Sequence, residues 1–389
     1  MRKSIVGFLA IATVTCLGLA GFAYLRSSHE EKSEQYRQDC LQHTVAEDWL
    51  ALESAARAWL DFEENGDEAR LYLAEALVQN RKSEEALRVL NAVSPSFQGY
   101  TQVLHVRAEL LFSELNRPLD ALPLWEELLE LEPRATVPRQ RLIYWYSMTL
   151  QRPELQEAIL DAIRVGSEPP EAYTYLFLLN DLNFSDGLTM STRWRLAYPD
   201  DASLEVAQAI FAAKQTADKL LPTFGTSTVS PGDQSLVKNC LTKYPDALEP
   251  LALTLDQAVF AGDTEQVTRL LQNAPPEAAE DSRFWRFRGW LMQSQGRLKE
   301  SREAYEEGLR IHPWDWSIRL LLADVLRREG SQDAAADAAS LAMQGKELKA
   351  RILSSPNARE LEEDLVYDLL EYFQETGPAV VAEAMARRL

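Results

Sequence analysis

Adjacent glutamates recur along the chain and are the first groups to consider for acid–base chemistry. Two neighbouring carboxylates can divide the roles of proton donor and proton acceptor in a hydrolytic reaction. These pairs occur at corresponding places of successive helical segments, and carboxylates that repeat at one place indicate a solvated helix face. They therefore predict no catalytic site. Examples of such pairs are Glu84–Glu85, Glu126–Glu127 and Glu306–Glu307.

Histidines and cysteines are scarce, which limits metal and redox chemistry. The four histidines show no metal-ligand spacing, and His312 is expected at the solvated end of a helix. Three cysteines are too few for a disulfide framework, and Cys40 and Cys240 are expected to stay unpaired. No metalloprotease, nucleophile-elbow, P-loop or dinucleotide motif occurs. The sequence predicts no catalysis, metal or cofactor, with an enzyme site in the irregular stretches 202–247 or 350–389 as the alternative.

Arginines and aromatic residues on helix surfaces remain as candidates for partner binding. Arg286 and Trp290 are four residues apart and share a helix face with Arg283 close by. Guanidinium groups beside an indole can clamp a peptide carboxylate or stack on an aromatic group. The alternative is that these arginines only form ion pairs with neighbouring acidic residues. Further candidates for the same role are Asp324, Arg327, Tyr144 and Tyr173.

Three glycines set the period of the elements that would position these residues. Gly262, Gly296 and Gly330 are 34 residues apart, and each is expected at a turn between two helices. Apolar residues recur every three or four positions, which indicates amphipathic helices and not strands. A small residue at Gly289 would let two helices approach to about 8–10 Å. The sequence thus predicts antiparallel helix pairs repeated along the chain.

The segment 282–315 carries this repeat in its clearest form, with Trp285, Gly289, Gly296, Tyr305 and Pro313 at regular places. It resembles the tetratricopeptide repeat (TPR), a helix-turn-helix unit of 34 residues. The resemblance implies an all-α, right-handed superhelical solenoid of about nine TPR-like units, with the candidate binding residues in its concave groove. Other copies are expected at 33–66, 67–100, 136–169, 168–201, 248–281 and 316–349, with one strong helix at 116–133 and a degenerate copy at 202–247.

Four domains follow from these patterns. An N-terminal segment at 1–26 precedes a TPR-like solenoid at 27–247, whose last unit is interrupted by a proline- and glycine-containing loop at 222–232. A well-formed array is expected at 248–349. Capping helices are expected at 350–389, where they would cover the last apolar face of the solenoid.

The N-terminal segment contains 22 uncharged residues from Ser4 to Leu25 after Arg2 and Lys3. As a helix it would span the roughly 30 Å hydrocarbon layer of a bilayer. We therefore expect a single-pass transmembrane anchor, with the solenoid on the extracytoplasmic, periplasmic side because the basic residues precede the segment. A cleaved signal peptide, ending near Ala23, is the alternative.

The charge balance bears on the kind of partner. Sixty acidic residues face 40 basic ones, and a net charge of −20 repels phosphate backbones. Nucleic acid is therefore not expected as a partner. A small-molecule substrate is not expected either, because the sequence shows no catalytic motif. We expect a membrane-tethered scaffold or adaptor that binds other proteins or peptide segments in its groove. The alternative is a structural accessory subunit of a cell-envelope complex.

Overall fold

The computed structural model describes residues 28–220, 231–357 and 359–389, and every regular element among them is a helix. The predicted all-α class is confirmed for these residues. The anchor predicted at Ser4–Leu25 lies outside the described residues, as does most of the loop predicted at 222–232.

The predicted single-pass membrane localisation is corrected. Among the described residues, no helix combines the length and the apolar character that crossing a bilayer requires. Most of the helices are amphipathic instead, burying one side against their neighbours and exposing charged residues on the other.

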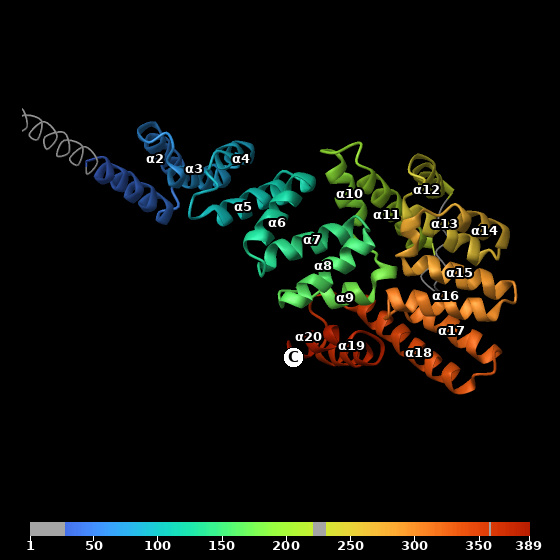
Figure 1. Ribbon diagram of the computed structural model, residues 1–389. Coiled ribbons are helices and arrows are strands. Elements are labelled where there is room, and N and C mark those ends of the chain that lie inside the picture. The colour runs from blue at the N-terminus through green and yellow to red at the C-terminus, as the bar shows by residue number, and fades with distance from the viewer. Residues whose placement is uncertain (1–27, 221–230, 358) are drawn as a thin grey trace, which may run out of the picture. The chain divides into compact units, whose positions relative to one another are not determined.

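The chain divides between Leu124 and Trp125 into two compact units (Figure 1). In the first unit, successive helices pack as pairs around small side chains such as Ala56, Ala74 and Ala86. A helix over residues 28–45 is followed by α2 (Trp49–Phe62), α3 (Asp67–Gln79), α4 (Ser83–Asn91), α5 (Tyr100–Glu109) and the π-helix η1 (Leu110–Glu114). Helix α6 (Pro118–Leu131) spans the division.

The second unit begins with one regular helix pair and has three more before its last two helices. Its elements before residue 248 are α7 (Thr136–Met148), α8 (Arg152–Val165), α9 (Ala172–Phe177), the 3₁₀ turn η2 (Leu179–Asp181), α10 (Gly187–Arg195), α11 (Ala202–Leu220) and α12 (Pro231–Lys243). Those that follow are α13 (Leu248–Phe260), α14 (Thr264–Gln272), the 3₁₀ turn η3 (Pro276–Ala279), α15 (Ser282–Ser294), α16 (Leu298–Ile311), α17 (Trp316–Arg328), α18 (Gln332–Ser354), α19 (Glu363–Thr376) and α20 (Ala379–Ala386).

One backbone feature marks the repeat in both units. The three turn glycines, at 262, 296 and 330, have φ of 70°, 75° and 90°, the left-handed conformation that the spacing predicts. Four other residues adopt φ between 53° and 59° at the equivalent turn of earlier pairs, 34 or 35 residues apart. The TPR-like turn therefore continues where the sequence has no glycine. These residues are Glu47, Arg81, Asn116 and Leu150.

The close helix contact predicted at Gly289 is also present. A Cβ atom built there would collide with the ring of Tyr305, which lies on the second helix of the same pair. The Ser301 hydroxyl donates a hydrogen bond of 2.8 Å to the Gly289 carbonyl. Small residues at these places therefore let α15 and α16 pack closely.

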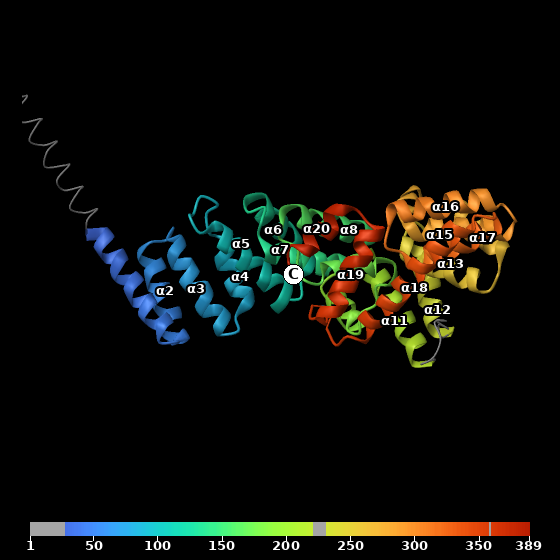
Figure 2. The same cartoon turned by 90° about the horizontal axis from the view of Figure 1, so that it is seen from below.

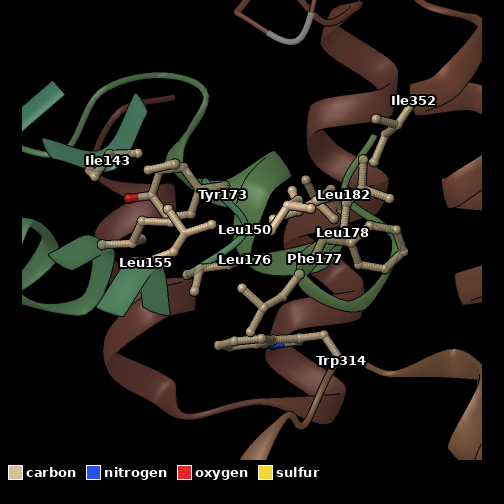
Figure 3. Packing of buried hydrophobic residues seen from close by; sticks show 14 of the residues in the cluster. Ile143, Leu150, Leu155, Tyr173, Leu176, Phe177, Leu178, Leu182, Trp314 and Ile352 are labelled. Atoms are coloured by element: carbon tan, nitrogen blue, oxygen red, sulfur yellow. The ribbon is translucent and has the colours of Figure 1, made fainter. Parts of the chain in front are cut away.

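The unit predicted at 168–201 departs from the repeat. Its first helix, α9, has only six residues and passes into η2 and an irregular stretch before α10. This segment is largely buried, because its leucines and Phe177 pack in one cluster with Ile352 on α18 and with Trp314 in the turn between α16 and α17 (Figure 3). A long amphipathic helix with one solvated face would not fit that position.

The C-terminal helices return to the start of the second unit. Figures 1 and 2 both place α20 beside α8, and α19 packs on α20. Phe373 on α19 lies 6.4 Å from Tyr173 between ring centroids, and Tyr372 lies 5.6 Å from Phe177. Arg388 donates a 2.6 Å hydrogen bond to the Glu168 carbonyl. Contacts between residues some 200 positions apart therefore close this unit.

Candidate functional site

The first helices of the three regular pairs, α13, α15 and α17, form a surface that we call the A-helix face. Neighbouring helices in this set pack on each other, and their side chains pair across the contact. Arg286 donates a hydrogen bond of 2.7 Å to Asp256, and Gln293 donates one of 2.7 Å to Asp324. Side chains 30 or 31 positions apart are thus neighbours on this face.

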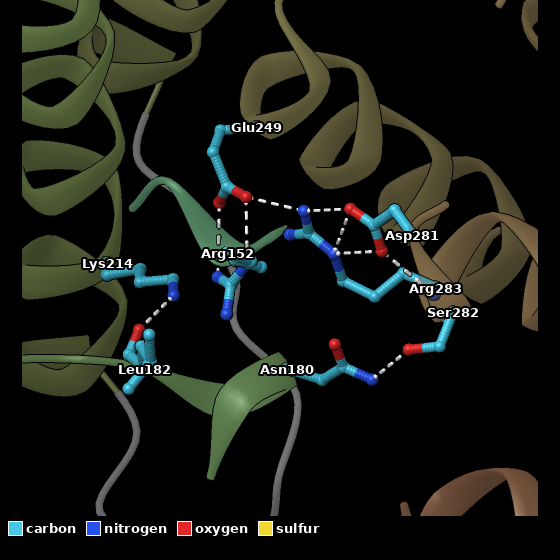
Figure 4. Close-up of polar contacts among 8 residues, drawn as sticks. All are labelled: Arg152, Asn180, Leu182, Lys214, Glu249, Asp281, Ser282 and Arg283. Carbon is cyan, nitrogen blue, oxygen red and sulfur yellow. Dashed lines mark hydrogen bonds and ion pairs between the residues drawn. The ribbon is translucent and has the colours of Figure 1, made fainter. Parts of the chain in front are cut away.

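The N-terminal ends of α13 and α15 are closed by a buried ionic cluster (Figure 4). Arg283 donates to Glu249 at 2.5 Å and to Asp281 at 2.6 Å. Glu249 also accepts hydrogen bonds of 2.8 and 3.1 Å from Arg152 on α8, which lies 97 positions earlier. All four side chains are at most 9% exposed. The chain itself therefore occupies this end of the A-helix face.

The segment after α9 closes the same end from the other side. The Asn180 amide donates to Ser282 at 2.8 Å and to Asp315 at 2.7 Å, the residues at the starts of α15 and α17. Lys349 on α18 pairs with Asp181 at 2.8 Å. The Lys214 ammonium donates to the Leu182 carbonyl at 2.7 Å. Residues 180–182, at the end of η2, are thus held by polar contacts to α11, α15, α18 and the start of α17.

Burial and pairing set the protonation of this closed end. Burial alone would raise the pKa of Glu249, but the guanidinium groups of Arg152 and Arg283 outweigh it and lower the pKa well below its usual range. Burial lowers the pKa of Lys214 to about 8, and the nearby Arg152 charge adds to the effect. Burial also lowers the pKa of His312, which is 1% exposed and not at a solvated helix end as predicted.

Two predicted partner-binding residues lie inside the second unit. Arg283 is 5% exposed and belongs to the ionic cluster. Tyr173 is 4% exposed, and its hydroxyl donates a 3.0 Å hydrogen bond to Glu168. Tyr144 is half-buried against the edge of Trp194, and burial raises its pKa to about 12. None of these three side chains is part of the open surface described next.

Beyond the buried cluster the A-helix face is open, from Asp256 on α13, Arg286 on α15 and Leu320 on α17 onward, and we call this part the open end. Trp290 is half-buried, and Arg286 beside it keeps 20% of its side chain exposed while pairing with Asp256. Asp324 is approached by Arg327 at 3.5 Å and by Arg328 at 3.9 Å. The structure thus brings together four of the predicted residues, on two adjacent helices. They are Arg286, Trp290, Asp324 and Arg327.

Two exposed apolar residues of this open end were not predicted. Phe260 is 71% exposed at the end of α13, and Leu320 is 42% exposed on α17. Each lies four positions from a charged residue of the same face, Asp256 and Asp324 respectively, so each points the same way. Both are 30 positions from Trp290, and this interval in the sequence could have revealed them.

Other features give little support for chemistry. Over residues 28–220, 231–357 and 359–389, no three His, Cys, Asp or Glu side chains are arranged to hold a metal ion. A surface hollow of about 240 Å³ lies between α6, α7 and α8, lined by Leu142, Tyr146, Glu154 and Asp161 among others. Cys40 and Cys240 are buried free thiols, as predicted.

Comparison with known proteins gives similarity to solved structures only. No family model and no curated protein matches the chain. MamA (residues 41 to the end) from Desulfovibrio magneticus is 13% identical, with a TM-score of 0.30, over 46% of this chain and 95% of that chain. A tetratricopeptide repeat protein from Parabacteroides merdae is 12% identical, with a TM-score of 0.28, over 76% and 99%. Yeast Tom70 is 11% identical, with a TM-score of 0.29, over 92% and 89%.

These similarities are too low to carry an argument about function. The TPR-like description of this chain rests on its own helix pairs, its 34-residue turn spacing and the close contact at Gly289.

Proposed function

We propose that this protein is a non-catalytic TPR-like scaffold that binds a peptide segment of another protein on the open end of the A-helix face. The observation that carries the proposal is the contrast between the two ends of that face. One end is filled by Arg152, Asn180 and neighbouring residues, whereas the open end presents the half-buried Trp290, three arginines and two exposed apolar side chains. Tryptophan and arginine are the residue types that most often dominate protein interfaces.

The charges at the open end favour a partner segment that carries carboxylates. Three arginines, Arg286, Arg327 and Arg328, share two aspartates there. Among these five side chains the positive charges outnumber the negative ones, whereas the chain as a whole has a net charge of −20. Oppositely charged surfaces steer association and exclude partners of the wrong sign.

The test is partner recovery after chemical crosslinking of cells that express the full chain. The double variant Arg286→Ala with Trp290→Ala should lose the proteins recovered with wild type, because truncation of an interface hot spot costs about 2 kcal/mol or more, roughly thirtyfold in affinity. The matched control is Arg310→Ala with Tyr367→Ala, an exposed arginine and an exposed aromatic residue on other helices.

The proposal predicts that the control keeps the partners and that both variants melt as wild type does. Equal recovery with wild type and Arg286→Ala, Trp290→Ala would remove the open end from consideration as the binding surface.

A further inference from the structure

Two exposed apolar residues and the half-buried Trp290 form one row across the three helices of the A-helix face. Asp256–Arg286 and Gln293–Asp324 establish that residues 30 or 31 positions apart are neighbours on adjacent helices. Phe260, Trp290 and Leu320 are separated by 30 and 30 positions. They therefore follow one another from α13 to α15 to α17. We call this set the apolar row.

The apolar row lies between two charged rows on the same face. One helical turn earlier lies the pair Asp256–Arg286, and one turn later Gln293 contacts Asp324, with Arg327 and Arg328 beside it. A row of this kind is unusual on a soluble surface, because Phe260 and Leu320 are 71% and 42% exposed and nothing in the described residues covers them.

The spacing of the row specifies the shape of what can cover it. Packed helices lie about 8–10 Å apart, so three successive apolar side chains are separated by that interval. Residues seven apart in an α-helix lie about 10.5 Å apart and return to the same side after nearly two full turns. Apolar residues three or four apart in a partner helix, at about 5–6 Å, would not match the interval between neighbouring side chains of the row.

From this geometry we propose that the apolar row binds an amphipathic α-helix of a partner protein, with apolar residues seven positions apart and acidic residues flanking them. The inference rests on the proposed function and gives the partner segment its chemistry. A helix of this kind places three apolar side chains over Phe260, Trp290 and Leu320. Its carboxylates then face Arg327 and Arg328, which share the single carboxylate of Asp324.

The experiment measures binding of labelled synthetic helical peptides to the full chain by fluorescence anisotropy. The test peptide has 18 residues with leucine at positions 1, 8 and 15 and glutamate on the flanks. The comparison peptide has the same composition with leucine at positions 4, 8 and 12, which also lie on one face but at about 6 Å intervals. We expect the test peptide to bind at least tenfold more tightly.

The variants locate the site. Phe260→Ala with Leu320→Ala should weaken binding of the test peptide at least tenfold, and Arg327→Glu with Arg328→Glu should weaken it further at low salt. The matched control is Met343→Ala with Leu353→Ala, two exposed apolar residues on α18. It should bind as wild type does, and circular dichroism melts should show all three variants folded.

Equal affinity for the two peptides, or wild-type affinity in Phe260→Ala, Leu320→Ala, would overturn the helix proposal. These results are separable from failure of the proposed function. If Arg286→Ala, Trp290→Ala loses its partners in the crosslinking experiment while the row variant keeps them, the scaffold function stands and the helix proposal fails. If neither variant loses partners, both fail.

Discussion

At the scale of single residues, the turn between the two helices of each pair is the most regular feature of the chain. Within the part of the chain that the structure describes, seven turns have a residue with positive φ at the equivalent place, and three of these residues are glycines. A side chain in the left-handed region costs about 1–2 kcal/mol, and asparagine tolerates this region better than most residues. The remaining turns therefore store a small strain that substitution can reveal.

Replacing the exposed Arg81 by glycine should raise the free energy of unfolding by about 0.5–1 kcal/mol, because relief of the strained φ of 59° exceeds the entropy that glycine loses on folding. Urea unfolding of the two chains measures the difference. The control Asn116→Gly should change stability by less. Leu150→Gly should instead destabilise, since Leu150 is 3% exposed and its removal leaves a cavity. A loss of stability in Arg81→Gly would contradict this account of the turn.

The buried carboxylate of Glu249 gives a pH-dependent prediction. Its pKa is lowered in the folded chain, so its contribution is present above its ordinary value of 4.5 and is lost as the pH falls below that value. Glu249→Gln should therefore lower the free energy of unfolding by about 1.5–3 kcal/mol at pH 7. The difference in free energy of unfolding between wild type and this variant should be smaller at pH 4 than at pH 7.

Urea unfolding at pH 7, 5 and 4 tests this dependence, with the exposed Glu157→Gln on α8 as control. A difference that stays constant or widens towards acid pH would mean that Glu249 is not held as a carboxylate by the two arginines.

At the scale of elements, the short segment of α9 and η2 packs against the starts of α15 and α17. Asn180 is its central contact, because one amide bonds the starts of both α15 and α17. Asp315 is 4% exposed, so removing this donor leaves a buried carboxylate with one hydrogen bond fewer.

Asn180→Ala should therefore lower the free energy of unfolding by about 1–3 kcal/mol. The contacts of residues 172–182 with α15 and α17 should open before the rest of the unit unfolds. Hydrogen exchange should quicken in residues 172–182 and at the first turns of α15 and α17. The control Asn273→Ala removes an exposed side chain that bonds only the Arg269 carbonyl, and it should leave the same peptides unchanged. Unchanged hydrogen exchange in the Asn180 variant would show that apolar packing alone holds residues 172–182 in place.

At the scale of the whole molecule, two compact units are built from the same helix pair, but they are completed differently. The first is a succession of neighbouring pairs, whereas the second is closed by α20 on α8 and by α19 on α9. Such closure makes the start of the second unit depend on the end of the chain.

Phe373→Ala should destabilise the second unit by about 3–5 kcal/mol, because its ring is fully buried between Tyr173 and Trp314. Hydrogen exchange should rise in α8 and α9, although these helices lie far earlier in the chain, while α2, α3 and α4 keep their protection. A chain that ends at Asn357 should show the same pattern more strongly. Undisturbed exchange in α8 and α9 would show that this end folds without the C-terminal helices.

The sequence by itself determined the repeating pair. The glycine spacing, the small residue at 289 and the three-to-four periodicity act between residues close in the chain, so local sterics suffice to specify them. The same local information placed Arg286, Trp290, Asp324 and Arg327 on one face of their helices. It could not find the turns at Glu47, Arg81 and Leu150, because those residue types do not prefer positive φ.

Only the tertiary structure decided which part of the A-helix face is free. Arg283 and Tyr173 occupy places that a single repeat would leave open, and they are buried by segments that lie about 35 to 200 positions away, such as Glu249 and Phe373. Arg152 lies 97 positions from Glu249, and nothing in either local pattern predicts that they meet. Burial of this kind depends on long-range packing, in which the free energy comes from area removed from water and not from the intrinsic preference of any one repeat.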